Sequence, residues 1–390
     1  MISLDEALAL VRDRKYTGET EWVPLELAED RVLAEDISAA HASPRFDNSA
    51  VDGFAVGSPK PPWKIVGMVA AGNFHSSELR EGESVRIMTG APTPLGTYAV
   101  VMQEDCAVSG ELTCTEHLLF QGENIRRQGE EFTFGDIIHL AGTRITPPVL
   151  GSLRSVGLPE APVRAMPKVG ILSTGSELVE PGIELEPSQI YESNSLPMSA
   201  ILQRYGSKVE TLYVADHEEA TREAVELLLQ KSDLVITTGG ASVGAFDYIP
   251  ATIAALGFET VFSKVAIKPG KPVAFGTRTD GKAWFGLPGN PMSAQTTFLL
   301  FVLAAIGREL EFFTGALLNA YARKPGREEF VPANFVLSPD PGIAILPTVG
   351  SHATGGYAVS NGMARIPASV ELLAPGEPIQ FAFFPWSRLP

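Results

Sequence analysis

The sequence Asp233-Leu-Val-Ile-Thr-Thr-Gly-Gly-Ala-Ser-Val-Gly244 joins a short apolar run to a loop of glycine and small hydroxyl residues, and a helical pattern follows. The stretches Lys168–Glu177 and Ala283–Pro291 share this design. Such loops bring backbone N–H groups and the positive end of a helix up to an anion, because no Cβ atom stands in the way. Strand and helix patterns alternate through residues 165–310, which predicts a mostly parallel, doubly wound sheet. Ligands of such sheets bind beyond the carboxyl ends of the strands, so we expect the functional site there.

The overall composition limits the classes of partner. The formal net charge of −16 over 390 residues argues against broad nucleic-acid binding, which needs a basic surface. Ser3 and Glu6 form the pattern of a helix capping box, so we expect a helix there and not a signal peptide. Cys106 and Cys114 suit a reducing compartment and are expected to be buried. The longest apolar run, 298–306, is too short to cross a bilayer and predicts a buried helix. We therefore expect a soluble cytoplasmic protein with neither nucleic-acid nor membrane partners.

The chain divides into regions of different character. Residues 1–45 and 136–164 are expected to form one N-terminal mixed α/β region, with the helix of the second segment packed on the helix of the first. Between them, residues 46–135 alternate short apolar runs with Gly/Pro turns, which predicts an inserted β domain. The central α/β domain of residues 165–310 is followed by an all-β region over 311–390.

A basic cluster stands out in this acidic chain. Lys264, Lys268 and Lys271 fall within eight residues, around the turn Pro269-Gly270. Because proline fixes φ and glycine permits positive φ, the turn is stiff. The cluster has the composition of an oxyanion clamp; a solvated hairpin is the alternative, since charge runs are usually surface features.

Carboxylates follow the predicted strands. Glu177, Asp216 and Asp247 each come after a strand-like run, at the edge where ligands are expected. Oxygen ligands of this kind suit Mg²⁺. The alternative is local: Asp247 caps a helix, and Glu177 opens one, where its charge complements the helix dipole.

Three turn-forming stretches are weaker signals. The loop Leu287-Pro-Gly-Asn-Pro291 is rigid and would form a fixed wall for a ligand, or simply a strand-to-helix turn. Asp52 and Thr89 lie in stretches whose composition turn chemistry alone explains. Taken together, the residues indicate phosphoryl or anhydride chemistry assisted by a metal and lysines.

The ordered set of motifs resembles the molybdopterin molybdenumtransferase (MoeA) family, which is similar to the E domain of gephyrin. The matching stretches span nearly the whole chain in the family's order: Phe46–Val56, Arg86–Pro92, Gly122–Glu130, Leu172–Leu178, Thr238–Gly244 with Asp247-Tyr248, Ala266–Pro272 and Leu287–Pro291.

This resemblance implies a fold and a reaction. The expected fold is multidomain α/β: a central doubly wound MogA-like domain, an inserted β domain and a C-terminal β-barrel-like domain, in an L-shaped homodimer. The implied reaction inserts molybdate into adenylylated molybdopterin, releases AMP and uses a divalent cation such as Mg²⁺. A molybdopterin adenylyltransferase is a candidate transient partner.

Carried over by position, the resemblance and the loop chemistry assign roles to individual residues. In the family the cleft lies between subunits, so Asp52 and Thr89 would serve the partner's site. Ser176 stands where family members often have Asp, which changes the expected number of carboxylates around the metal. The expected sets are catalytic Asp52, Thr89, Asp216, Lys264 and Lys268; metal-binding Glu177 and Asp247; and substrate-binding Lys271, Arg327, Ser351, Gly239, Gly240, Ser242, Pro288, Gly289 and Pro291.

Two alternative functions are compatible with parts of the sequence. The doubly wound domain alone would allow a MogA-like molybdopterin adenylyltransferase, although the additional regions argue against it. A non-catalytic scaffold resembling gephyrin's E domain is disfavoured by the retained Lys264, Lys268 and Asp247. Tungstate could replace molybdate, since the two oxyanions have nearly the same size and charge.

Overall fold

The computed structural model describes residues 1–239, 248–337, 340–347, 350–353 and 355–387. Contacts within the chain divide it into two units. One unit comprises Met1–Glu19 and Arg164–Pro390, and the other comprises Thr20–Val163.

The first unit is built on a six-stranded sheet with the order β16-β13-β17-β21-β20-β18. The strands β16, β13, β17 and β21 are parallel to one another, whereas β20 pairs antiparallel with both β21 and β18. The prediction of a mostly parallel, doubly wound sheet is therefore confirmed. The strand bounds are β13 (Val169–Thr174), β16 (Val209–Val214), β17 (Leu234–Thr238), β18 (Glu259–Phe262), β20 (Ala274–Thr277) and β21 (Ala283–Leu287).

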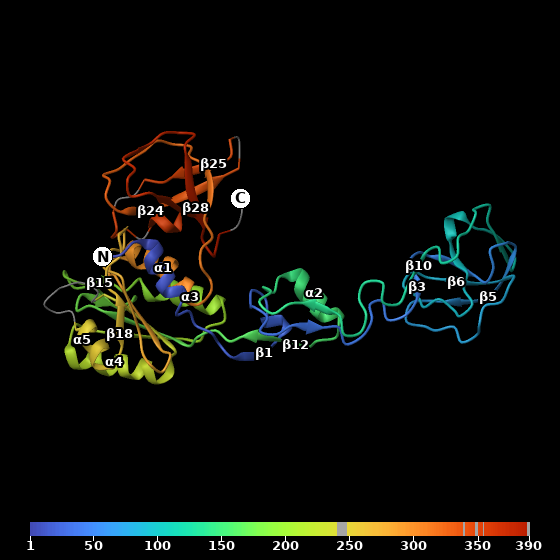
Figure 1. Cartoon of the computed structure of the whole chain (residues 1–390), viewed down its shortest axis with the longest axis horizontal. Coiled ribbons are helices and arrows are strands. Elements are labelled where there is room, and N and C mark those ends of the chain that lie inside the picture. Colours follow the sequence, from blue (N-terminus) through green and yellow to red (C-terminus); the bar gives the residue numbers. More distant parts are fainter. Residues whose placement is uncertain (240–247, 338–339, 348–349, 354, 388–390) are drawn as a thin grey trace. The chain divides into compact units, whose positions relative to one another are not determined.

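Helices cover both faces of this sheet. Because side chains alternate along a strand, Leu172 and Val235 pack on one face and Ile171 and Ile236 on the other. The first pair meets α4 and α5, which lie together on one side of the sheet in Figure 1. The second pair shares a core with α3, with α1 and with the buried run 298–306, as expected for that run. The bounds are α3 (Ser195–Arg204), α4 (Glu218–Lys231), α5 (Ile249–Ala255), α6 (Pro291–Thr297), the π-helical η3 (Phe298–Val302) and α7 (Leu303–Ala305).

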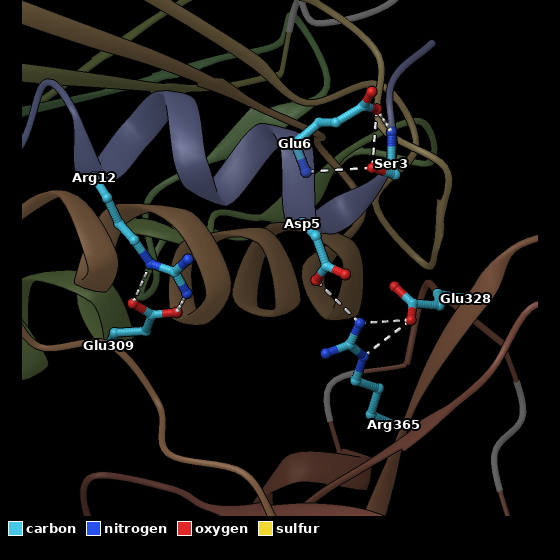
Figure 2. Close-up of polar contacts among 7 residues, drawn as sticks. All are labelled: Ser3, Asp5, Glu6, Arg12, Glu309, Glu328 and Arg365. Atoms are coloured by element: carbon cyan, nitrogen blue, oxygen red, sulfur yellow. Dashed lines mark hydrogen bonds and ion pairs between the residues drawn. The ribbon is translucent and has the colours of Figure 1, made fainter.

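The N-terminal helix α1 (Leu4–Arg12) belongs to this unit. Ser3 and Glu6 form the predicted capping box, drawn in Figure 2. Arg12 pairs with Glu309 at 2.5 Å. The apolar face of α1 packs against the 298–306 helix. The expectation that α1 packs with the helix of residues 136–164 is therefore wrong. The apolar face of α1, made of Leu4, Ala7, Leu8 and Val11, is buried in the core of the central domain.

A barrel-like β layer completes the unit. Its path is β19-β24-β26-β28-β22, and β25 pairs with β24. A bridge between Leu317 and Ile343 brings the end of β22 to β25, and the enclosed side chains form one apolar core. Arg365 of β26 contacts Asp5 and Glu328, which ties this layer to α1 (Figure 2). The bounds are β19 (Ile267–Lys268), β22 (Phe313–Ala316), β24 (Glu328–Val336), β25 (Gly342–Ile345), β26 (Gly362–Ile366) and β28 (Pro378–Phe383), with α8 (Gly355–Ala358) and the pairs β14 (Leu178–Val179) with β15 (Ile190–Tyr191) and β23 (Tyr321–Ala322) with β27 (Leu372–Leu373).

The second unit contains a six-stranded sheet with the order β7-β4-β6-β5-β9-β8, which fits the β strands predicted for residues 46–135. A separate apolar core lies around α2 and the strand pairs β1-β12 and β2-β11. The bounds are β1 (Thr20–Pro24), η1 (Leu25–Leu27), β2 (Ile37–Ser38), β3 (Asn48–Ser49), β4 (Gly53–Val56), β5 (Trp63–Val69), β6 (Glu83–Ile87), β7 (Ala99–Met102), η2 (Gln103–Asp105), β8 (Ala107–Ser109), β9 (Leu112–Cys114), β10 (Ile125–Arg126), β11 (Ile137–His139), α2 (Pro147–Ser155) and β12 (Glu160–Arg164).

Two details bear on the expected class of protein. Cys106 is partly buried, but Cys114 is exposed because it alternates with the buried Thr113 along β9, so its predicted burial is wrong. Within the part of the chain that the structure describes, no helix is both long enough and apolar enough to cross a membrane.

Candidate functional site

A polar cavity of about 590 Å³ lies beside the barrel-like layer. Its walls come from the turn after β19, the loop after β21, strand β24 and residues 350–351. It therefore draws on segments far apart in sequence. The lining residues are Lys268, Pro269, Gly270, Lys271, Pro272, Pro288, Asn290, Met292, Ser293, Arg327, Glu329, Val331, Gly350 and Ser351.

The cationic side chains that line this cavity are, among the described residues, Lys268, Lys271 and Arg327. Strand β19 pairs parallel with β24, which sets Lys268 opposite Glu329 and brings Arg327 close by. One guanidinium nitrogen of Arg327, Nη1, donates to the Ile267 carbonyl at 3.0 Å, which orients the group. Pairing with β24 also excludes a free hairpin here. Cations gathered around a cavity favour an anionic ligand.

A buried carboxylate accompanies these cations. Glu329 is 4% exposed, and its Oε1 lies 2.6 Å from the Nζ of Lys268. Its Oε2 lies 3.2 Å from the Nε of Arg323, but no described residue gives this oxygen a well-aligned hydrogen bond. The Arg323 contact is therefore mainly Coulombic. Burial, with the added charge of Glu329, raises the pKa of Tyr321 to about 12.

Small groups complete the cavity wall. Asn290 Nδ2 approaches Ser351 Oγ at 3.4 Å, and the Met292 N–H donates to the Ser351 carbonyl at 3.1 Å. Gly270 has φ +100°, and a Cβ there would lie 2.4 Å from the side chain of Thr297. The Pro-Gly turn thus requires its glycine.

The glycine loops after the central strands meet at one edge of the sheet. A Cβ on Gly289, after β21, would lie 3.5 Å from the Cα of Gly239, after β17. Asn194 fixes the loop after β21, because its Nδ2 donates to the Gly289 carbonyl at 2.8 Å. Beside Gly239, the buried hydroxyl of Thr174 has no hydrogen-bond partner among the described residues. This edge therefore offers polar groups to a ligand next to the basic cavity.

Two predicted carboxylates lie at the β13–β16 end of the same sheet. Glu177 is exposed in the turn before β14 and opens no helix, so that expectation is wrong. Asp216 accepts from the Ser176 N–H at 3.1 Å, and its own N–H donates to the Ser176 hydroxyl at 3.1 Å. Burial, with the charges of Glu177 and Asp216, raises the pKa of Tyr213.

This acidic edge supplies oxygen donors but no complete metal cage. Within residues 1–239, 248–337, 340–347, 350–353 and 355–387, no three His, Cys, Asp or Glu side chains group as metal ligands. Asp247, Gly240 and Ser242, which the sequence assigned to this site, lie outside the described residues. Lys264 is described but does not line the cavity, and Pro291 begins α6 without lining it.

Asp52 and Thr89 lie in the other unit. Strand β4 begins after Asp52 and pairs with β6, which ends before Thr89, so the two side chains meet. Asp52 Oδ1 accepts from the N–H of Thr89 at 2.6 Å and from its hydroxyl at 2.7 Å. These hydrogen bonds lower the pKa of Asp52, and the carboxylate is fully exposed.

Comparison with known proteins identifies the family. Residues 2–157 match the MoeA N-terminal region (domains I and II), residues 170–308 a probable molybdopterin-binding domain, and residues 314–384 the MoeA C-terminal region (domain IV). A molybdopterin molybdenumtransferase from Haemophilus influenzae is 40% identical over 316 residues, which are 79% of this chain and 78% of that protein. The chain belongs to the molybdopterin molybdenumtransferase (MoeA) family.

Other members of the MoeA family agree over similar lengths. The Bacillus subtilis molybdopterin molybdenumtransferase is 39% identical over 317 residues, covering 77% of this chain and 73% of its own. A solved structure of the molybdopterin biosynthesis MoeA protein from Pyrococcus horikoshii has a TM-score of 0.83 and 27% identity, with 98% of this chain and all of that chain covered. The predicted fold class is thereby confirmed.

The sequence patterns of this MoeA family member did not identify several polar residues near the cavity. Glu329 and Asn290 line it, and Arg323 and Asn194 hold parts of its surroundings. Glu329 could have been found from its place at the start of β24, two residues after Arg327, since alternate residues of an extended chain share a face. Asn194 carries no local signal, because its partner is 95 residues away.

Proposed function

We propose that this chain inserts molybdenum from molybdate into adenylylated molybdopterin, with release of AMP. The observation that carries the proposal is the cavity lined by Lys268, Lys271, Arg327 and Ser351. It lies in a chain of the molybdopterin molybdenumtransferase family, beside the edge where the glycine loops meet.

The cavity suits a small tetrahedral dianion. Molybdate accepts hydrogen bonds at every oxygen, and the lysine ammonium groups and the arginine fork donate them with charge assistance. The hydroxyl of Ser351 adds a neutral donor on the wall formed with Asn290. Since the chain as a whole is acidic, this local charge is what would attract the oxyanion. Tungstate would bind by the same contacts.

The nucleotide-activated pterin would lie along the adjacent glycine-loop edge. Pro288 and Gly289 form a stiff wall between the cavity and Gly239, held by the Asn194 hydrogen bond. Backbone N–H groups and the hydroxyl of Thr174 can donate to phosphate oxygens there. The anhydride would thus be fixed next to the bound molybdate, and positioning supplies much of the rate.

A divalent cation such as Mg²⁺ fits the acidic edge. Glu177 and Asp216 provide hard oxygen donors, and Asp247, outside the described residues, is the further ligand that the sequence suggests. Bound there, the cation would neutralise phosphate charge and polarise the anhydride. Asp216 keeps the β13 and β16 loops in register through Ser176, which holds Glu177 in place.

We also propose that the enzyme works as a homodimer in which Asp52 and Thr89 serve the partner's cleft. Their hydrogen-bonded pair is exposed and shaped by its own strands, so it can be presented as a rigid unit. Lys264 would act from outside the cavity lining, next to Val265, whose N–H donates to the carbonyl of Lys271. Transient docking of a molybdopterin adenylyltransferase remains part of this proposal.

The decisive experiment follows AMP release from adenylylated molybdopterin by the purified full-length chain. We expect release to require the chain and to rise with molybdate, and tungstate to substitute for it. Addition of a chelator should stop the reaction, and Mg²⁺ should restore it. Release that ignores molybdate, or synthesis of the adenylylated pterin from ATP, would count against the proposal and favour an adenylyltransferase.

A further inference from the structure

Glu329 is a buried carboxylate in the wall of a cavity otherwise suited to anions. It is 4% exposed, and its Oε1 contacts the Lys268 ammonium at 2.6 Å. A negative charge beside an anion site repels the ligand and lowers the affinity for it, unless another effect of the same residue offsets the repulsion. Its contacts indicate what that is.

Lys268 needs a partner to hold its side chain. The lysine stem is flexible, the side chain is half exposed, and it starts from a strand of only two residues. Fixing such a side chain costs entropy when a ligand binds. Glu329 lies directly opposite on β24, which is paired with β19 on one side and β26 on the other. The ion pair therefore orders Lys268 before any ligand arrives.

Arg323 balances the charge of this carboxylate. Its side chain is 2% exposed, and its Nε lies 3.2 Å from Glu329 Oε2. Nε and Nη2 of Arg323 both donate to the Lys324 carbonyl, and Nη2 also donates to the Arg327 carbonyl, so the guanidinium is fixed to the backbone. The Arg323–Glu329 pair is neutral in sum, and the positive charge of Lys268, Lys271 and Arg327 is left for a ligand.

We propose that Glu329 is a positioning residue for oxyanion binding, which fixes the Lys268 ammonium at the cavity wall; this rests on the function proposed above. An ammonium group has three N–H donors. One of these N–H groups donates to Glu329, and the remaining ones are directed into the cavity. They are thus already ordered when an oxyanion binds.

The test is the variant Glu329→Asp, which keeps the charge and the counterion of Arg323 but withdraws the carboxylate from Lys268 by one methylene. Molybdate binding is measured by calorimetry on the full-length chain, and AMP release gives KM for molybdate and kcat. We expect binding to weaken about tenfold, the order of one immobilised long side chain. KM should rise in parallel while kcat stays nearly constant. The matched control is Glu328→Asp, the neighbouring carboxylate, which pairs with Arg365 and does not line the cavity.

A double-mutant cycle shows whether the effect passes through Lys268. In a Lys268→Ala background, Glu329→Asp should no longer change molybdate affinity. Unchanged or tighter binding by Glu329→Asp alone, or an effect that persists without Lys268, overturns the inference. If the wild-type chain binds no molybdate, the proposed function itself fails. Thermal unfolding checks each variant, and Glu329→Gln, which keeps the side-chain length, replaces Glu329→Asp if the latter does not fold; it should weaken binding only while Lys268 is present.

Discussion

The β13–β16 end of the central sheet and the cavity around Lys268 belong to one unit but offer opposite charges. The first presents Glu177 and Asp216, and the second presents Lys268, Lys271 and Arg327. The acidic end is made by turns that directly follow strands. The basic cavity is assembled from four separate stretches of chain. Two regions of opposite charge can thus be built within one unit by two different routes.

The loop after β21 connects these two regions. Gly289 lies against Gly239, which itself lies against Thr174 at the end of β13, and Asn290 contacts Ser351 in the cavity. Because proline stands on either side of Gly289 and Asn290, the loop can keep the two charges at a fixed separation. We therefore predict that substitutions in one region abolish its ligand binding and leave ligand binding by the other region unchanged.

The largest effect is expected from removing two cavity cations together. The variant Lys268→Ala/Arg327→Ala should lose about 4 kcal/mol of molybdate binding, about 1000-fold, since each charged hydrogen bond contributes about 2 kcal/mol. Calorimetric titration with molybdate measures it. Lys231→Ala, which removes a surface lysine paired with Glu210, should bind as the wild type does. If the double variant binds molybdate as tightly as the wild type does, the cavity is not the anion site.

Gly239→Ala tests the junction between the two regions. Gly239 has φ +86°, and a Cβ there would lie 2.4 Å from the Thr174 carbonyl oxygen. We expect a loss of about 3 kcal/mol in the free energy of unfolding, from backbone strain plus the clash. Denaturant unfolding gives the value.

Gly257→Ala is the matched control for this junction. Gly257 has φ +83°, but a Cβ there meets only the end of the Arg278 stem at 3.8 Å. It should therefore lose only about 1 kcal/mol, the cost of positive φ alone. Equal losses for the two variants would show that the β17 loop relaxes freely.

Glu177→Ala tests the acidic end alone. The Mg²⁺ concentration for half-maximal AMP release should rise about tenfold, the order of one charged contact. The KM for molybdate at saturating Mg²⁺ should stay constant, because the basic cavity is intact. Glu180→Ala, an exposed carboxylate three residues on, should change neither quantity. A change in the molybdate KM by Glu177→Ala would show that the two regions are coupled.

The smallest effect is expected for Ser351→Ala. Its hydroxyl is a neutral donor, so molybdate binding should weaken by about 1 kcal/mol, or about fivefold. Calorimetric titration again measures it, and Ser155→Ala in α2 is the control in the other unit. A loss as large as that of Lys268→Ala would mean that the hydroxyl, and not the charge, selects the oxyanion.

Much of the local structure could be predicted from short-range patterns. The capping box at Ser3 and Glu6, the strands that carry the glycine loops and the buried 298–306 helix depend on neighbours within a few residues. The turn at Pro269-Gly270 likewise has the positive φ that its glycine permits, and Gly270 tolerates no Cβ. Glu177 misled the prediction, since a carboxylate after a strand suits a turn and a helix start equally well.

The sequence by itself determined the alternation of strands and helices, the loop chemistry and the family, because these depend on the order of residues along the chain. Only the tertiary structure decided that α1 packs on the central domain and that Glu329 faces Lys268. Both depend on which surfaces meet after the chain folds back, across separations of 61 residues between Lys268 and Glu329 and far more for α1. No local pattern encodes such a meeting, since it is selected by the total apolar area and the charge pairs it buries.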